Sequence, residues 1–152
     1  MSIWWSLHLR REAASVPLAR RLLLGTMETA GVDPDISYDL SVALSEACAN
    51  AVEHGGDPVS GSASAAYRVT AYLDGEKCRI EVADSGPGFP ARRGRRPALA
   101  ARTGTLAEHG RGLGLIEQLA DHVHFRNRPG RGAVVSFDKI LKWREGALLK
   151  VS

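Results

Sequence analysis

The strands of the protein are predicted by hydrophobic residues that alternate with polar ones. Residues 3–9 show this period of two, which is typical of a strand with one buried face. The same alternation covers residues 67–84 on both sides of Asp74-Gly75, a dipeptide that favours a tight turn between antiparallel strands. Another pair of such segments spans residues 122–139. We therefore expect one N-terminal strand and two antiparallel hairpins.

Two helices are predicted between the first strand and the first hairpin, because hydrophobic residues recur there at intervals of three and four. The first helix runs to Ala30, with Ser15 as its expected N-cap and Gly31 as its stop. The second follows Asp33, a residue type favoured as N-cap, and runs to the glycine pair at 55–56.

The next segment, residues 89–109, has no hydrophobic period and is rich in Arg, Ala, Gly and Pro. A connection of that length inside a compact domain is usually a lid, a binding loop or a disordered segment. A third helix is predicted directly after it, over residues 113–123, where hydrophobic residues recur at helical spacing behind a glycine-rich entry.

The order of these elements is strand, two helices, hairpin, long loop, helix, hairpin. It predicts an α+β two-layer sandwich, in which helices cover one face of a mainly antiparallel sheet. The length of 152 residues suits a single domain over residues 1–152. The tail from Ile140 to Ser152 contains hydrophobic residues, so we expect it to pack against the domain, as a strand or as a helix.

Composition restricts the function less than the pattern does. The formal charge of +3 is weak evidence for nucleic acid, because 16 of the 20 basic residues are arginine in a sequence rich in alanine and glycine. No hydrophobic run approaches the roughly 20 residues of a membrane span, and no secretory signal is recognisable. Cys48 and Cys78 lie too far apart for a metal-binding cysteine pair. We expect a cytoplasmic protein that makes no direct contact with nucleic acid or membrane.

A narrow polar sector on the second helix is the first candidate for a site. At about 100° per residue, the polar sector lies directly beside the core stripe rather than opposite to it. The core stripe contains Ile36, Leu40, Ala43, Leu44, Ala47 and Ala51, and the polar sector contains Asp39, Glu46, Asn50 and Glu53. Glu46 and Asn50 are one turn apart on the same face, so they are able to address one ligand. The sector is either a solvated flank or one wall of a site.

Two neighbours of this sector favour structural roles. Cys48 lies among small residues without a charged partner, so it is predicted as a packed thiol rather than a nucleophile. His54 lies at the end of the helix, where it either complements the helix dipole or touches a ligand, and the first role is favoured.

Two glycine-rich segments are further candidates. One follows a predicted strand and contains Asp84, Gly86 and Gly88; the other precedes a predicted helix and contains Gly110, Gly112 and Gly114. Glycines at a helix N-terminus let backbone N–H groups approach phosphate oxygens, and the helix dipole favours negative charge there. Taken alone, each segment is also explained as a turn or a flexible helix entry. Neither matches the P-loop or the dinucleotide-binding pattern.

Taken together and in this order, the motifs resemble the GHKL superfamily of ATPases, which share the Bergerat ATP-binding fold. The stretch EACANAVEHG is similar to the N-box of its serine-protein kinase anti-sigma factors, and DSGPGF and GRGLGL are similar to the two glycine boxes. The resemblance covers roughly residues 3–138.

This resemblance implies a site for ATP and Mg²⁺. Asn50 would coordinate the Mg²⁺ that bridges the triphosphate, and Glu46 would be the general base that accepts the proton of an attacking serine hydroxyl. Asp84 would accept a hydrogen bond from the adenine amino group, and Gly86 and Gly88 would let the chain pass close to the base. The second box would bind the phosphates through Gly110, Arg111, Gly112, Leu113 and Gly114.

The resemblance also implies an ATP lid at about residues 89–109. The lid arginines either clamp phosphates or face solvent; they are Arg92, Arg93, Arg95, Arg96 and Arg102. One position departs from the family, because Ala133 follows Gly132 where a threonine is usual, and this removes a hydroxyl contact near the adenine. The arginine-rich lid and the basic charge are further departures, which concern the partner more than the fold.

The implied function is an anti-sigma factor and serine/threonine protein kinase that phosphorylates an anti-anti-sigma protein and sequesters a sigma factor. A homodimer is implied as well, and the hydrophobic residues near the N-terminus offer a surface for it. The alternative is an ATP-gated regulator that binds its partner without transferring phosphate. Glu46 beside Asn50 favours the kinase, since a binding module needs no base.

Overall fold

The computed structural model describes residues 2–54, 66–84, 111–128 and 132–147. In chain order its elements are β1 (Ile3–Arg10), α1 (Ser15–Ala30), α2 (Pro34–His54), β2 (Ala66–Leu73), β3 (Lys77–Asp84), α6 (Arg111–Leu119), β4 (His122–Arg128) and β5 (Gly132–Ile140). The predicted order of strands and helices is confirmed. Within the described part, no helix is both long and apolar enough to cross a lipid bilayer.

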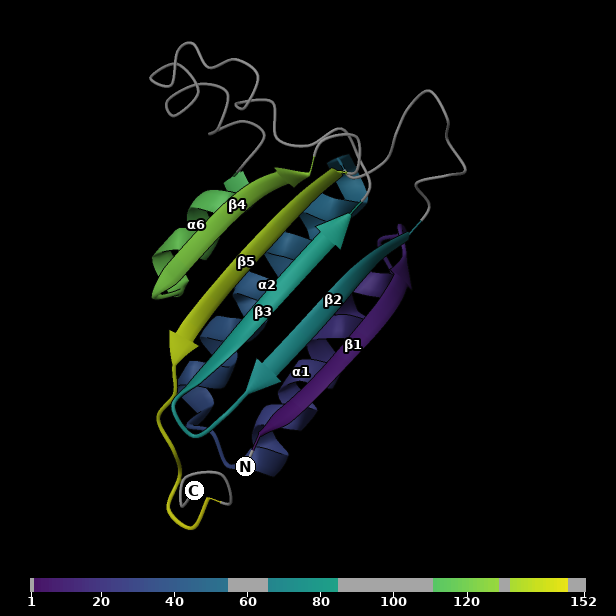
Figure 1. Ribbon diagram of the computed structural model, residues 1–152. Coiled ribbons are helices and arrows are strands. Elements are labelled where there is room, and N and C mark those ends of the chain that lie inside the picture. Colours follow the sequence, from purple (N-terminus) through teal and green to yellow (C-terminus); the bar gives the residue numbers. More distant parts are fainter. Residues whose placement is uncertain (1, 55–65, 85–110, 129–131, 148–152) are drawn as a thin grey trace.

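The five described strands form one sheet in the order β1-β2-β3-β5-β4, and every neighbouring pair is antiparallel. Figure 1 shows the three helices on the same face of this sheet, with α2 between α1 and α6. The predicted α+β two-layer sandwich is therefore confirmed.

The hairpin between β2 and β3 is fixed by a side chain at its turn. Asp74 Oδ1 accepts hydrogen bonds from the N–H groups of Glu76 and Lys77 at 2.8 and 2.9 Å. The N–H of Asp74 in turn donates to the carbonyl oxygen of Lys77 at 3.1 Å. These bonds to the charged carboxylate lower the pKa of Asp74. The turn predicted around Asp74-Gly75 is confirmed.

The corner between α1 and α2 also follows the sequence signals. Gly31 ends α1 with φ of 91°, and a Cβ at this position would lie 2.6 Å from the Cβ of Ala147. Both the left-handed backbone and the close approach of the C-terminal segment require glycine there. Asp33 Oδ1 accepts the N–H of Asp35 at 2.8 Å, which confirms Asp33 as the N-cap of α2.

Two helix boundaries differ from the prediction. Ser15 is not the N-cap of α1: it lies inside the helix, and its hydroxyl donates to the carbonyl oxygen of Glu12 at 2.7 Å. The third helix ends at Leu119 rather than continuing to Val123, because Val123 pairs with β5 as part of β4. Hydrophobic spacing did not distinguish a longer helix from a strand at this boundary, since Val123 fits the helical spacing and also occupies an inward position of β4.

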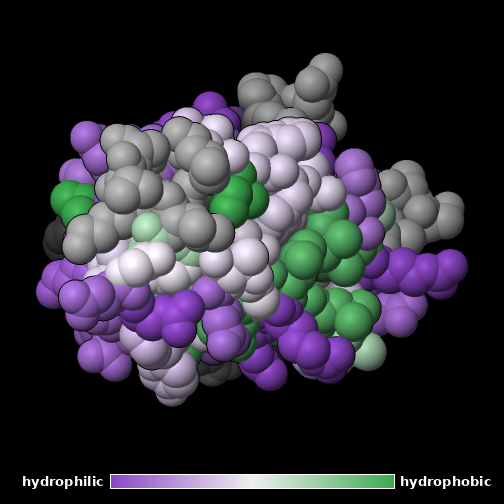
Figure 2. Space-filling view, turned by 90° about the horizontal axis from the view of Figure 1, so that it is seen from below, coloured by the Kyte–Doolittle hydropathy of each residue, from purple (hydrophilic) through white to green (hydrophobic). Residues whose placement is uncertain are grey.

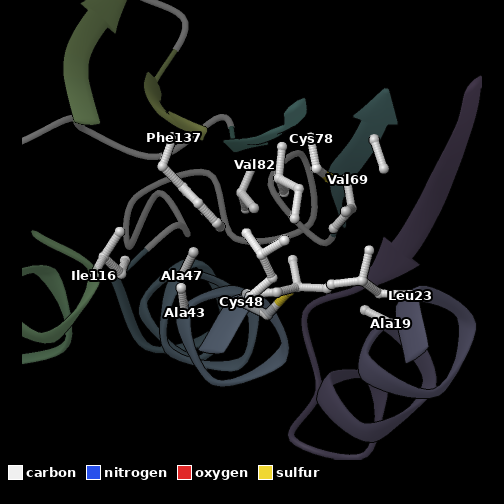
Figure 3. Close-up of a cluster of buried hydrophobic side chains, with 14 of the residues drawn as sticks. Ala19, Leu23, Ala43, Ala47, Cys48, Val69, Cys78, Val82, Ile116 and Phe137 are labelled. Carbon is white, nitrogen blue, oxygen red and sulfur yellow. The ribbon is translucent and has the colours of Figure 1, made fainter. Parts of the chain in front are cut away.

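The core lies between the helix layer and the sheet. Figure 3 shows side chains of α1, α2 and α6, including Leu23, Ala47 and Ile116, meeting Val82 and Phe137 of the sheet. The predicted core stripe of α2 is buried along its whole length. Residues 141–147 of the tail pack against the domain, although they form neither a helix nor a regular strand: Leu141 and Ala147 are buried, and Trp143 Nε1 donates to the carbonyl oxygen of Gly75 at 3.2 Å. Residues 148–152 lie outside the described residues.

Candidate functional site

The described parts of the motifs singled out in the sequence lie at one end of the molecule. The last turn of α2, the end of β3, the first turn of α6 and the start of β5 all lie at the upper end in Figure 1. A direct contact joins two of them, since the N–H of Ala133 on β5 donates to Asp84 Oδ1 on β3 at 3.3 Å. Segments far apart in the chain therefore come together at this end of the sheet.

The polar sector of α2 lies on the side of this helix that is next to α6. At its lower end, Asp39 Oδ2 lies 4.0 Å from Lys139 Nζ, and the same ammonium donates to the carbonyl oxygen of Leu119, the last residue of α6. The opposite flank of α2 is covered by α1, where Arg20 donates to Ser45 Oγ at 3.3 Å. The sector predicted beside the core stripe is thus on the α6 side of α2.

Glu46 and Asn50 are the half-buried members of this sector, whereas Glu53 is exposed. Neither Glu46 nor Asn50 has a hydrogen-bond or ion-pair partner among the residues that the structure describes. Half-buried polar groups usually have partners, because withdrawing them from water without a hydrogen bond is costly. A carboxylate and a carboxamide one turn apart are therefore available to a ligand on the α6 side.

Asp84 is the last residue of β3 and is half-buried. It lies opposite Tyr67 in the register with β2 and accepts the N–H of Ala133 from the other neighbouring strand. Ala133 thus contacts Asp84 through its backbone, although it lacks the hydroxyl usual at this position. A carboxylate in this place suits a ligand that presents an N–H group.

The first turn of α6 contains Arg111, Gly112, Leu113 and Gly114. Leu113 is buried and anchors the turn to the core, whereas a Cβ added at Gly114 would meet no atom within 4 Å. The first N–H groups of a helix have no partner within it, and together with the dipole they favour an anion. The first turn of α6 is therefore a candidate for anion binding, at the same end of the molecule as Glu46 and Asn50.

Several predicted site residues lie outside the described residues. These are Gly86, Gly88 and Gly110, together with the lid at 89–109 and its arginines; the side chains of His54 and Arg111 are likewise not described.

A buried hydrogen-bond chain beside the site was not predicted from the sequence. The Ser15 hydroxyl already donates to Glu12, so the hydroxyl of Tyr67 donates to Ser15 Oγ, 2.6 Å away. The thiol of Cys48 also hydrogen-bonds to Tyr67. Ser15 and Tyr67 are 52 positions apart, and no sequence pattern connects them. The chain ties α1, α2 and β2 together beneath the site.

The same burial settles the role of Cys48. Desolvation raises the pKa of its thiol to about 12, against the smaller lowering effect of the hydrogen bond with Tyr67. The thiol is therefore protonated at neutral pH and cannot act as a nucleophile. This confirms the prediction of a packed core thiol.

The residues present fit a nucleotide with Mg²⁺ better than a metal held by protein alone. In the described part of the chain, no three His, Cys, Asp or Glu side chains gather to hold a metal ion. Mg²⁺ commonly takes only one or two protein oxygens and completes its shell with phosphates and water. The Asn50 amide oxygen would suit such a metal, the helix end of α6 would suit phosphates, and the Asp84 carboxylate would suit a base that presents an N–H group.

Comparison with known proteins adds a family to this geometry. The profile of the family described as histidine kinase-like ATPase domain matches residues 9–139. The chain is similar to the serine-protein kinase RsbW of Bacillus licheniformis, with 33% identity over 83% of this chain and 78% of the relative. It is also similar to the RsbW of Bacillus subtilis, with 32% identity over 76% and 72% of the two chains.

Two further matches point the same way. An anti-sigma F factor of a Thermoanaerobacter species is 29% identical over 74% of this chain and 77% of its own. A crystal structure of the RsbU and RsbW domains of a Mycobacterium tuberculosis protein matches 91% of this chain with a TM-score of 0.63 at 20% identity. This chain spans 33% of the length of that solved protein. The structural similarity supports the fold of this chain.

Proposed function

Because the chain belongs to the histidine kinase-like ATPase domain family, we propose that it is an ATP-dependent protein-serine/threonine kinase that also acts as an anti-sigma factor. The observation that carries the kinase part is the pair Glu46 and Asn50. Both are half-buried on the α6 side of α2, and neither has a partner in the described part of the chain. A module that only bound a nucleotide would need the amide but not the carboxylate.

In this proposal each of three side chains has one task. Asn50 holds Mg²⁺, which neutralises phosphate charge when bound. Asp84 accepts a hydrogen bond from the adenine amino group. Glu46 accepts the proton of the substrate hydroxyl while the oxygen of that hydroxyl forms a bond to the γ-phosphorus. At the same time, the bond between the γ-phosphorus and the bridging oxygen breaks, and ADP leaves with that oxygen.

The phosphates are assigned to the backbone of the second glycine box. Gly110, Arg111, Gly112, Leu113 and Gly114 would supply N–H donors or positive charge, and Gly86 and Gly88 would pass beside the base. The first turn of α6 supports this assignment, because Leu113 is buried while Gly114 is open. The segment 89–109 would be the lid of a single domain that spans residues 1–152.

The partners follow from the names of the relatives. Proteins named serine-protein kinase and anti-sigma F factor match the same chain. We therefore assign an anti-anti-sigma protein as the phosphorylation substrate and a sigma factor as the sequestered partner. Both act on transcription, so we place the protein in the cytoplasm, without a direct contact to nucleic acid.

A homodimer is part of this proposal, and the end of the molecule away from the site offers a surface for it. Figure 2 views that end and shows a hydrophobic area between hydrophilic ones. The start of β1 and α1 enclose an open groove of about 460 Å³, lined by Ile3, Arg21, Leu22, Gly25, Thr26 and Thr29. Leu18 and Leu22 on α1 are 52% and 40% exposed. Large exposed hydrophobic side chains of this kind mark interaction surfaces.

The kinase proposal is tested with Glu46→Gln, which keeps the shape of the side chain and removes the base. With Mg-ATP and a candidate anti-anti-sigma protein, we expect phosphate transfer to slow by a factor on the order of 10²–10⁴, while ATP affinity stays near that of the wild type. Transfer is measured from radiolabelled ATP, and affinity by calorimetry.

The control is Glu53→Gln, which removes an exposed carboxylate two turns further along the same sector. We expect it to transfer phosphate at close to the wild-type rate. Equal rates for Glu46→Gln and wild type would exclude Glu46 as the base. ATP-dependent partner binding by a wild type that transfers no phosphate would instead support the ATP-gated regulator.

A further inference from the structure

Lys139 is a charged residue at an inward position of β5. It follows Val135 and Phe137 with the spacing of two that points side chains toward the helices, and both of these residues belong to the core. Its own side chain is only 16% exposed. An ammonium that is largely withdrawn from water has to be paired or hydrogen-bonded, because burial of an uncompensated charge is costly.

The ammonium of Lys139 contacts two helices. Nζ donates to the carbonyl oxygen of Leu119 at 2.7 Å and lies 4.0 Å from Asp39 Oδ2 on α2. Leu119 is the last residue of α6, where carbonyl groups lack partners within the helix and the dipole favours a cation. Lys139 thus caps α6 and links its C-terminus to α2.

The turn after α6 is also fixed to β5. The N–H of Asp121 donates to the carbonyl oxygen of Asp138 at 2.9 Å, and Asp121 Oδ2 accepts the N–H of Ile140 at 2.7 Å. Together with Lys139, these bonds hold the C-terminal end of α6 against residues 138–140 of the sheet. The nine residues of α6 span only about 13 Å, so a shift of this end moves the other end as well.

We propose that Lys139 is a positioning residue for phosphate binding: it sets where α6 lies along α2, and thereby places the first turn of α6 relative to Asn50 and Glu46. This rests on the proposed function, because it takes the first turn of α6 as the phosphate-binding segment. Lys139 itself lies at the opposite end of the helix and touches no ligand.

The test is Lys139→Met, with Lys139→Arg as the conservative variant. A matched control is Arg144→Met, because Arg144 Nη2 donates to the carbonyl oxygen of Glu28 near the C-terminus of α1 at 2.8 Å. Both Met variants remove a cation from a helix end, but only Lys139 touches α6. Affinities for ATP, ADP and adenosine are measured by calorimetry with Mg²⁺, and hydrogen exchange of α6 amides is measured without nucleotide.

We expect Lys139→Met to weaken ATP and ADP binding by about tenfold, to leave adenosine binding unchanged and to speed exchange in α6. Lys139→Arg should restore most of the ATP affinity, and Arg144→Met should keep wild-type affinities and exchange in α6. Equal loss for adenosine and ATP, or wild-type ATP affinity in Lys139→Met, would overturn the proposal. A wild type that binds no ATP at all, but whose α6 exchange still depends on Lys139, would instead refute the proposed function.

Discussion

At the scale of single residues, Tyr67 is a polar side chain in the core whose hydroxyl connects two other buried groups. It is buried, its hydroxyl donates to Ser15 Oγ at 2.6 Å, and it hydrogen-bonds the Cys48 thiol. We expect Tyr67→Phe to lower the free energy of unfolding by about 1–2 kcal/mol, because it removes the hydrogen bonds that the buried Ser15 Oγ and Cys48 thiol make with the tyrosine hydroxyl. Urea denaturation measures this difference.

Tyr72→Phe is the matched control. Tyr72 lies on the same strand but on the opposite face of the sheet, and it is 36% exposed. Loss of its hydroxyl is expected to change the free energy of unfolding by less than about 0.5 kcal/mol. Equal effects of the two substitutions would show that the buried chain contributes nothing to stability.

The residues of the site were recoverable from the sequence to different degrees. Glu46 and Asn50 were placed on one face by helical spacing alone, and the structure puts them on the α6 side. Lys139 was recognisable in the sequence as a charged residue at an inward position of a predicted strand, but it was not predicted to have a role. The contact between Ser15 and Tyr67 carried none, because it exists only after β2 has packed against α1.

At the scale of elements, the β2–β3 hairpin shows how a turn residue sets a pH dependence. The pKa of Asp74 is lowered in the folded protein, chiefly by its bond from the Lys77 N–H. Its stabilising effect is therefore complete above the ordinary aspartate pKa of about 3.9 and is lost as the pH falls through the lower folded value. We expect Asp74→Ala to cost about 1 kcal/mol of unfolding free energy between pH 5 and 8, and less below about pH 4.

Thermal unfolding of wild type and variant across this pH range measures the difference. Asp74→Asn is the control, since its amide oxygen still accepts a hydrogen bond but does not titrate. It should show a smaller loss than Asp74→Ala, and its own stability should lack the decrease below about pH 4 that protonation of Asp74 causes in the wild type. A loss in Asp74→Ala that persists unchanged at pH 3 would contradict the assignment.

Element boundaries were the part of the fold that local patterns predicted least well. Ser15 was expected to cap α1 because serine favours N-caps, but its hydroxyl is engaged by Glu12 and Tyr67 instead. The third helix was predicted to continue to Val123, because this hydrophobic residue fits both the helical spacing and the alternation of a strand. Tertiary contacts end α6 at Leu119. Lys139 donates a hydrogen bond to the carbonyl oxygen of Leu119, and the chain then pairs with β5 as β4.

At the scale of the whole molecule, the candidate site joins three elements: α2 supplies Asn50 and Glu46, β3 supplies Asp84, and α6 supplies its first turn. A ligand that binds all three stabilises only the folded chain. At a hundredfold excess over its dissociation constant, Mg-ATP should add about 2.7 kcal/mol to the free energy of unfolding. For a chain of this size, the unfolding temperature should rise by about 5–11 °C.

The assignment of Asp84 to the base is tested by this shift. In Asp84→Asn, at the same ATP concentration, we expect most of the rise to disappear, because the carboxylate that accepts the adenine N–H is lost while the fold keeps its Ala133 contact through the amide oxygen. Asp35→Asn is the control, since Asp35 is exposed in the first turn of α2, at the opposite end of that helix from the site. It should retain the full shift. Scanning calorimetry decides the outcome, and an undiminished rise in Asp84→Asn would remove Asp84 from the nucleotide site.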